Sequence, residues 1–186
     1  MIDKDFIEKW APQYSYSSKI EYSDLLKDVQ EDIQNLKTIS KHTFENIIRW
    51  KAERNLNNVN WDQFEIYTEA IKDVLTLPEN QKTCRIEGLP GIGLPNASTI
   101  LHLIYPEDFP IVDIRTVRVL LSESQEVDGK LVNYLDPRYK IDYYRFRLWG
   151  YYLFKKAIIK IAKSTKKGLR EIDKALFAYD KKSLNI

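Results

Sequence analysis

Apolar residues recur at intervals of three and four along most of the chain, which predicts helices rather than strands. Clear helical repeats run through residues 3–10, 23–36, 43–54, 64–75, 97–104, 114–121, 143–163 and 166–180. Strand-like alternation is nearly absent. Residues 122–139 are the least helical, with Asp128-Gly129 as a turn and Asp136-Pro137 as a breaker. We therefore predict an all-α fold.

Finer features of the pattern predict how single helices begin and face the core. Asn60 with Gln63 resembles a capping box, and Thr165 is expected to cap the last helix. In the element that starts at Pro78-Glu79, the apolar positions Cys84 and Ile86 should face the core. Lys82 and Arg85 should then face outward.

A tight turn with two glycines, Leu89-Pro90-Gly91-Ile92-Gly93, interrupts the helical pattern. Glycine is needed where the backbone takes a positive φ or comes close to another group. Such a turn before a helix N-terminus collects unpaired N–H groups at the positive end of the helix dipole, which suits a phosphate oxygen. By itself the turn is a weak motif.

A second signal is Phe109-Pro110-Ile111-Val112-Asp113, an apolar and proline-stiffened approach to one carboxylate. The ordinary interpretation is that Asp113 caps the following helix by accepting from its first amides. Capping is compatible with chemistry, because a carboxylate held by amides stays ionised in a fixed direction.

Taken together, the two signals resemble the helix-hairpin-helix DNA glycosylases over about 35 residues. The match covers Leu89 to Gly93, then Leu94, Pro95, Asn96 and Ala97. In that family the catalytic Asp lies eighteen residues beyond the position that matches Pro95, which is Asp113. The segment around Asp113, with Arg118 and Val119 after it, looks especially like the adenine-specific mismatch glycosylases. The resemblance implies two helical lobes with residues 88–120 at their cleft.

The resemblance assigns roles to residues of both signals. Asp113 would be catalytic, and the DNA backbone would lie against Leu89, Gly91, Gly93, Asn96, Arg115 and Arg118. A K⁺ or Na⁺ ion would bind carbonyls of the turn, and no other cofactor would be required. Pro95 replaces the Schiff-base lysine of bifunctional members, so no lysine-dependent lyase activity is expected. Arg115 either pairs with Asp113 or faces DNA.

Length and composition bound the interpretation. With 44% hydrophobic residues in 186, the chain can form one globular unit over 1–186. We expect a central lobe over 40–121, which includes the turn at 89–93, and a second lobe from 1–39 and 139–186. The single Cys84 excludes an internal disulfide and a four-cysteine iron–sulfur cluster. No membrane-length apolar run or signal peptide is apparent, so we expect a cytoplasmic, nucleoid-associated monomer.

Charge is distributed unevenly. Nine basic residues and no acidic one lie between Tyr143 and Arg170, so the net charge of +2 leaves 2 − 9 = −7 for the rest. An anionic polymer would exploit this asymmetry, although a solvated helix face is the plainer interpretation. Trp50, Arg54, Tyr143 and Trp149 are candidates for a base pocket or a wedge. Burial under basic side chains is the plainer interpretation of Trp50.

These signals predict a monofunctional enzyme that flips out and hydrolytically excises a damaged, mispaired or modified base from double-stranded DNA in base-excision repair. The first alternative is a non-catalytic helix-hairpin-helix module that binds DNA. The second is a helical domain that binds RNA or protein. His102 is expected to be a satisfied helix residue, since two histidines make a His-rich metal site improbable.

Overall fold

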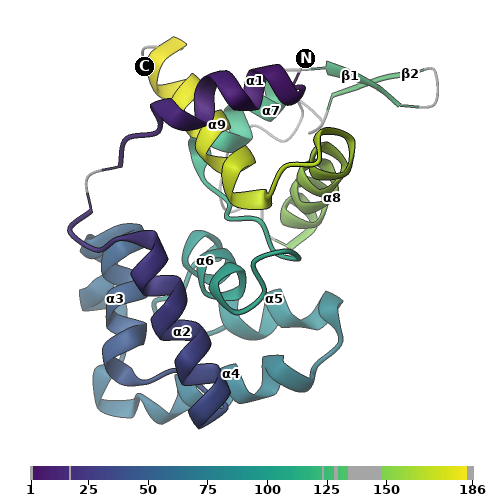
Figure 1. Ribbon diagram of the computed structural model, residues 1–186. Coiled ribbons are helices and arrows are strands. Elements are labelled where there is room, and N and C mark those ends of the chain that lie inside the picture. The colour runs from purple at the N-terminus through teal and green to yellow at the C-terminus, as the bar shows by residue number, and fades with distance from the viewer. Residues whose placement is uncertain (1, 17, 123, 128–129, 134–147, 184–186) are drawn as a thin grey trace. The chain divides into compact units, whose positions relative to one another are not determined.

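The computed structural model describes residues 2–16, 18–122, 124–127, 130–133 and 148–183. Their architecture is all-α, as predicted, with one small addition (Figure 1). The strands β1 (Ser124–Val127) and β2 (Lys130–Asn133) pair antiparallel, with Ser124 opposite Asn133. They lie in the stretch that we expected to be least helical. The sequence pattern missed them because four residues are too few for a clear alternation. The expected turn at 128–129 lies outside the described residues.

The chain divides into two compact units, Ser17–Pro106 and the combination of Met1–Tyr16 with Glu107–Ile186. These boundaries differ from the lobes expected at 40–121 and at 1–39 with 139–186. Residues of α2 (Tyr22–Leu36) belong with the helices that follow, because α2 packs against α3 (Lys41–Ala52) and α6 (Leu94–Ile104). α7 (Ile114–Ser122) instead packs against the C-terminal helix.

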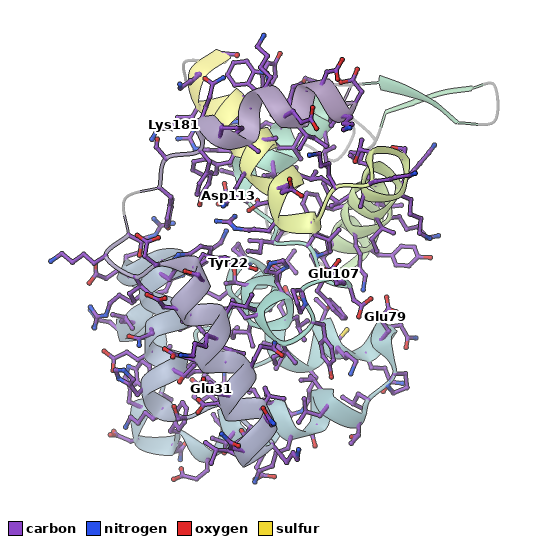
Figure 2. All side chains as sticks on the ribbon, in the orientation of Figure 1. Tyr22, Glu31, Glu79, Glu107, Asp113 and Lys181 are labelled. Atoms are coloured by element: carbon purple, nitrogen blue, oxygen red, sulfur yellow. The ribbon has the colours of Figure 1, made fainter. Side chains whose placement is uncertain are left out.

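The unit Ser17–Pro106 is built around α6, which contacts α2, α3 and α5 (Glu79–Glu87). Every residue of α6 except Pro95 is buried. The unit is completed by two 3₁₀ segments and one α-helix: η2 (Glu53–Asn58), η3 (Trp61–Gln63) and α4 (Glu65–Thr76). The outer face of α2 is acidic, and Glu31 on it is exposed (Figure 2).

The facing predicted for α5 is confirmed for Ile86 and wrong for Lys82 and Cys84. α5 buries Lys82, Thr83 and Ile86, whereas Cys84 is exposed. The Lys82 ammonium donates to the carbonyl of Val74 and to the Tyr105 hydroxyl, the latter at 3.0 Å. Val74 lies in the last turn of α4, where helix carbonyls lack partners within the helix. Lys82 therefore turns inward because it caps α4, and the helical period then carries Cys84 to the surface.

The other unit is built around α9 (Leu169–Ser183), which contacts α1 (Lys4–Trp10), η1 (Ala11–Gln13), α7 and α8 (Leu148–Thr165). The inner side of α9 buries Leu169, Ile172 and Leu176, as its sequence pattern predicts. On α1, the rings of Phe6 and Trp10 meet Tyr179 edge-on, each with a centroid distance of 5.2 Å.

Two predicted helix caps are not found. Thr165 ends α8, and its buried hydroxyl donates to the carbonyl of Ile161 instead of capping α9. α9 starts four residues later, where the N–H of Gly168 donates to the Glu171 carboxylate. Asn60 bonds Gln63 through its amide but makes no side-chain cap. Both sequences carried polar residues suited to caps, and the surrounding packing moved the helix starts.

Candidate functional site

We call Gly88–Gly93 the glycine turn; it lies between α5 and α6 in the unit Ser17–Pro106. The N–H groups of Gly88, Leu89 and Ile92 donate to carbonyls of α5 or of the turn itself, at 3.1 Å each. Pro90 has no N–H. The N–H groups of Gly91 and Gly93, which are both exposed, take no part in these hydrogen bonds. We expected the backbone amides from Leu89 to Gly93 to bind an anion. The amides of Gly91 and Gly93 are the two in this segment that are placed to do so.

Gly91 is required by the shape of the turn. Its φ is 73°, a left-handed conformation that side chains with a Cβ disfavour. A Cβ at this position would overlap the carbonyl of Asn58 and approach the nitrogen of Val59 to 2.9 Å. The residue is glycine because the backbone of η2 passes directly against it.

Tyr67 fixes the turn from behind. It is fully buried on α4, and its hydroxyl donates to the carbonyl of Pro90 at 2.7 Å. The same oxygen accepts from the N–H of Asn60 at 2.8 Å. The inward position of Tyr67 followed from the sequence pattern, but its role in holding the turn did not.

The glycine turn leads directly into the N-terminus of α6. Gly93 is the N-cap residue, and its carbonyl accepts from the N–H of Ala97 at 2.9 Å. Glycine offers no side chain to satisfy the first amides of the helix, so the positive end of the helix dipole is left to backbone donors. This arrangement suits an anion at the exposed glycines.

Asn96, which was predicted to contact the DNA backbone, does not present its side chain to solvent. Its side chain lies in the first turn of α6, and the residue is 1% exposed. Both amide atoms are buried and have no hydrogen-bond partner among the residues that the structure describes. Leu89 is also buried, whereas Pro90, Gly91 and Gly93 are exposed. A buried amide without a partner costs about 1–3 kcal/mol.

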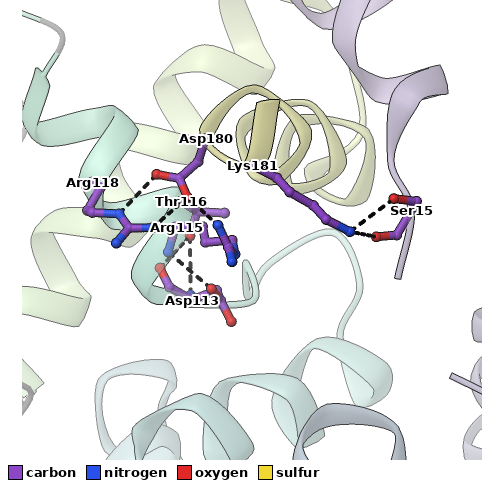
Figure 3. Close-up of polar contacts among 7 residues, drawn as sticks. All are labelled: Ser15, Asp113, Arg115, Thr116, Arg118, Asp180 and Lys181. Atoms are coloured by element: carbon purple, nitrogen blue, oxygen red, sulfur yellow. Dashed lines mark hydrogen bonds and ion pairs between the residues drawn. The ribbon is translucent and has the colours of Figure 1, made fainter. Parts of the chain in front are cut away.

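We call Phe109–Asp113 the aspartate loop; it precedes α7 in the unit that contains α9. Asp113 is half-buried, and its Oδ1 accepts from the N–H of Arg115 at 3.0 Å (Figure 3). Its carbonyl accepts from the Thr116 hydroxyl at 2.8 Å and from the N–H of Val117 at 3.0 Å. The predicted cap is therefore confirmed, and it fixes the direction of the carboxylate.

Arg115 does not direct its guanidinium to Asp113. Its Nη1 donates to Asp180 Oδ2 at 2.8 Å, and its guanidinium carbon lies 5.4 Å from the ring centroid of Phe177. Arg118 grips the same carboxylate through Nε at 3.0 Å and Nη2 at 2.6 Å. Both arginines, predicted to face DNA, are thus held by a fully buried aspartate of α9 (Figure 3).

Two contacts from α8 hold the start of the aspartate loop. The Tyr151 hydroxyl donates to the carbonyl of Pro110 at 2.9 Å. The Lys155 ammonium lies 3.5 Å from the ring centroid of Phe109, and both residues are buried. A lysine over an aromatic face is stabilised by the ring quadrupole. These contacts connect the basic helix to the backbone that carries Asp113.

The pocket and wedge candidates have different outcomes. Trp50 is 5% exposed, with its ring centroid 6.0 Å from that of Tyr22, so it is a core residue and no wedge. His102 is buried, and its Nε2 lies 2.8 Å from the Tyr22 hydroxyl. It is therefore a satisfied helix residue, as expected. Arg54 is exposed. Tyr143 lies outside the described residues, as does the side chain of Trp149.

Asp180 is the polar residue of this region that the sequence interpretation missed. It stands four residues after the inward-facing Leu176, and Asp173 likewise stands four after Leu169. Both aspartates are buried. A carboxylate on the apolar stripe of a helix is costly unless a cation reaches it. This spacing was the available signal, and it indicates a basic partner, which is Arg170 of α9 itself for Asp173 and the two arginines of α7 for Asp180.

In the described part of the chain, no group of three or more histidine, cysteine, aspartate or glutamate residues is arranged to hold a metal ion. Among the same residues, no helix combines the length and apolar character that crossing a bilayer requires. Comparison with protein-family models, curated proteins and solved structures found no significant match.

Proposed function

We propose that this protein is a monofunctional DNA glycosylase that removes a damaged, mispaired or modified base by hydrolysis. The resemblance around residues 89–113 supports this activity. The observation that carries most weight is the ion pair between Arg115 and Asp180. Its guanidinium is held by Asp180, so the arginine closest in sequence to Asp113 does not neutralise that carboxylate.

The glycine turn would hold the DNA backbone. Gly91 and Gly93 offer two exposed amides beside the N-terminus of α6, and a phosphate oxygen accepts from such donors. Contacts of this kind position the duplex without reading its sequence. The target nucleotide would then be flipped out of the stack, at a cost of a few kcal/mol that is lowest for damaged or mispaired bases.

Asp113 would act on the flipped nucleotide. When the glycosidic bond breaks, its electron pair leaves with the base and the sugar becomes cationic at C1′. The carboxylate stabilises that charge and accepts a proton from the attacking water, whose oxygen bonds to C1′. The departing base takes up a proton, so the products are a free base and an abasic site. The bond from the Arg115 N–H keeps the carboxylate in one direction throughout.

Neither an amine nor a cation has a step in this mechanism. Pro95 provides no nucleophile for a lyase reaction. Among the turn carbonyls that a K⁺ or Na⁺ ion would use, that of Leu89 already accepts from Ile92 and that of Pro90 from Tyr67. Each carbonyl oxygen keeps a second lone pair, so the ion that the resemblance implies stays a prediction.

The alternative of a non-catalytic DNA-binding module is favoured by the capping role of Asp113, which alone would explain the residue. An activity assay separates the two functions. The protein is incubated with duplexes that carry alkylated, deaminated, oxidised or hypermodified bases, and alkali then reveals abasic sites. We expect base release from at least one substrate.

The decisive variant is Asp113→Asn, which keeps an oxygen for the Arg115 amide and removes the charge. We expect release to fall by about 10²–10³-fold while DNA binding is retained. Asp62→Asn, on the exposed η3 segment, is the matched control and should release the base at the wild-type rate. Salt-sensitive binding without release from any substrate would instead favour the non-catalytic module.

A further inference from the structure

The outward face of α8 has a different composition from its inward face. Tyr151, Phe154, Ile158 and Ile161 are at most 2% exposed and pack inward. The opposite side carries four exposed residues, which we call the α8 stripe: Tyr152, Lys156, Lys160 and Lys163. At 100° per residue these four positions fall within an arc of about 80°, so they form one continuous line.

The lysines of the stripe are not used to hold the fold together. Lys156, Lys160 and Lys163 form no ion pair with any residue that the structure describes. Other lysines nearby have structural partners: Lys155 lies over Phe109, and Lys167 pairs with Glu8 at 3.1 Å and Glu171 at 3.6 Å. The stripe therefore holds positive charge that the described fold leaves uncompensated.

An aromatic ring completes the stripe. Tyr152 is 45% exposed, and the Lys156 ammonium lies 4.5 Å from its ring centroid. An exposed ring beside a row of cations is the arrangement by which proteins bind single-stranded nucleic acid, with bases stacked on the ring and phosphates paired with the cations. From Tyr152 to Lys163 the helix rises about 16 Å, enough for several consecutive phosphates.

We propose that the α8 stripe binds a single-stranded segment of DNA, with phosphates at the three lysines and an unpaired base on Tyr152. An anionic membrane surface fits less well. A helix that lies on a bilayer must present apolar side chains to the lipid, and those of α8 are buried within its own unit. The stripe shares its DNA partner with the proposed function but does not depend on base excision.

Binding of undamaged DNA tests the stripe directly. A short fluorescent oligothymidine is titrated by anisotropy at several salt concentrations, and the slope of log K against log salt is compared between variants. In K156Q/K160Q/K163Q we expect the slope to become smaller in magnitude by about 2, since each single-strand phosphate contributes about 0.7. The variant K156R/K160R/K163R should restore it.

The matched control carries the same change in net charge on the acidic unit. K27Q/K37Q/K72Q replaces three exposed lysines of α2, its C-cap and α4, and should keep the wild-type slope. Tyr152→Ala should weaken oligothymidine binding about tenfold without changing the slope, whereas Tyr152→Phe should bind normally. Circular dichroism verifies that each variant is folded.

Two results would overturn the assignment. Equal slopes for the stripe variant and the control would mean that net charge alone attracts DNA. Equal weakening of binding to vesicles of anionic phospholipid in the stripe variant would make the surface a general anion contact. A different result would contradict the proposed function. In that case the protein would still bind DNA but would release no base from any modified duplex.

Discussion

The glycine turn and the aspartate loop are held in place by different kinds of interaction. The turn depends on shape and neutral hydrogen bonds, namely the Cβ-free contact of Gly91 with η2 and the Tyr67 hydroxyl on Pro90. The loop precedes a helix whose two arginines converge on one buried carboxylate, Asp180. Substitutions that add even a small side chain should therefore destabilise the turn, whereas substitutions that remove a charge should destabilise the packing around the loop.

The same contrast extends to the units that carry them. Charged contacts are frequent around α9, where Arg170 pairs with Asp173 and donates to the Tyr14 hydroxyl, and Lys181 donates to Ser15 (Figure 3). In the unit with the turn, interior contacts such as that of Gln30 with the carbonyl of Leu103 are mostly neutral. Charged groups also take part, since Lys82 donates to uncharged oxygens and Asp32 accepts from the N–H of Ser40 at 2.8 Å.

The largest effect is expected from Gly91→Ala. The new Cβ would meet the carbonyl of Asn58 in a left-handed backbone, which should lower the free energy of unfolding by about 2–5 kcal/mol. Gly93→Ala is the control, because its Cβ would come no closer than 3.9 Å to Pro95 and its φ is −87°. Urea unfolding measures both. Similar losses in the two variants would contradict the shape argument.

Asp180→Asn tests the charged side of the comparison. It leaves Arg115 and Arg118 without their counter-ion, and we expect a loss of about 2–4 kcal/mol in unfolding free energy, reduced by their partial exposure. Asp73→Asn breaks the exposed pair with Arg85 and should cost at most about 1 kcal/mol. Base release should also fall in Asp180→Asn, because Arg115 becomes able to turn toward Asp113. Equal losses in the two variants would show that burial of Asp180 does not increase the contribution of its ion pairs to the free energy of unfolding.

Asn96→Leu should have a smaller effect of opposite sign. The Asn96 amide lacks partners in the described part of the chain, so replacing it with an apolar side chain of similar size should raise the unfolding free energy by about 1 kcal/mol. DNA affinity should stay unchanged, since the side chain is buried. Asn46→Leu, on a half-buried position of α3, is the comparison and should not stabilise. A destabilised Asn96→Leu protein would indicate that the amide has a partner.

The smallest effect concerns alkaline pH. Burial raises the pKa of Tyr14 from 10.0 to about 12 despite the opposing effect of Arg170. The folded state therefore retains a proton that the unfolded chain loses, and the stability due to neutral Tyr14 is complete below pH 10 and lost as pH rises toward 12. Urea unfolding across this range should show a shallower decline in Tyr14→Phe than in the wild type. Parallel curves would mean that Tyr14 titrates normally.

The local pattern of the sequence predicted much of this protein. The 3.6-residue period predicted the helices, because an amphipathic helix must place its apolar residues on one side. The paired glycines predicted the turn, and Asp113 was correctly predicted as a cap, since both depend on backbone groups only a few residues away. The charge asymmetry predicted a basic helix, although not which of its lysines are exposed.

The tertiary structure decided which distant groups meet. Lys82 turned inward because the end of α4 needed a donor, and Arg115 left Asp113 because Asp180, 65 residues away, is buried within its reach. The same packing buried Trp50 and Asn96, and it moved the unit boundaries to residues 17 and 107. Sequence spacing sets the local geometry of the backbone, but the partner of a long polar side chain depends on what else is brought beside it when the helices pack.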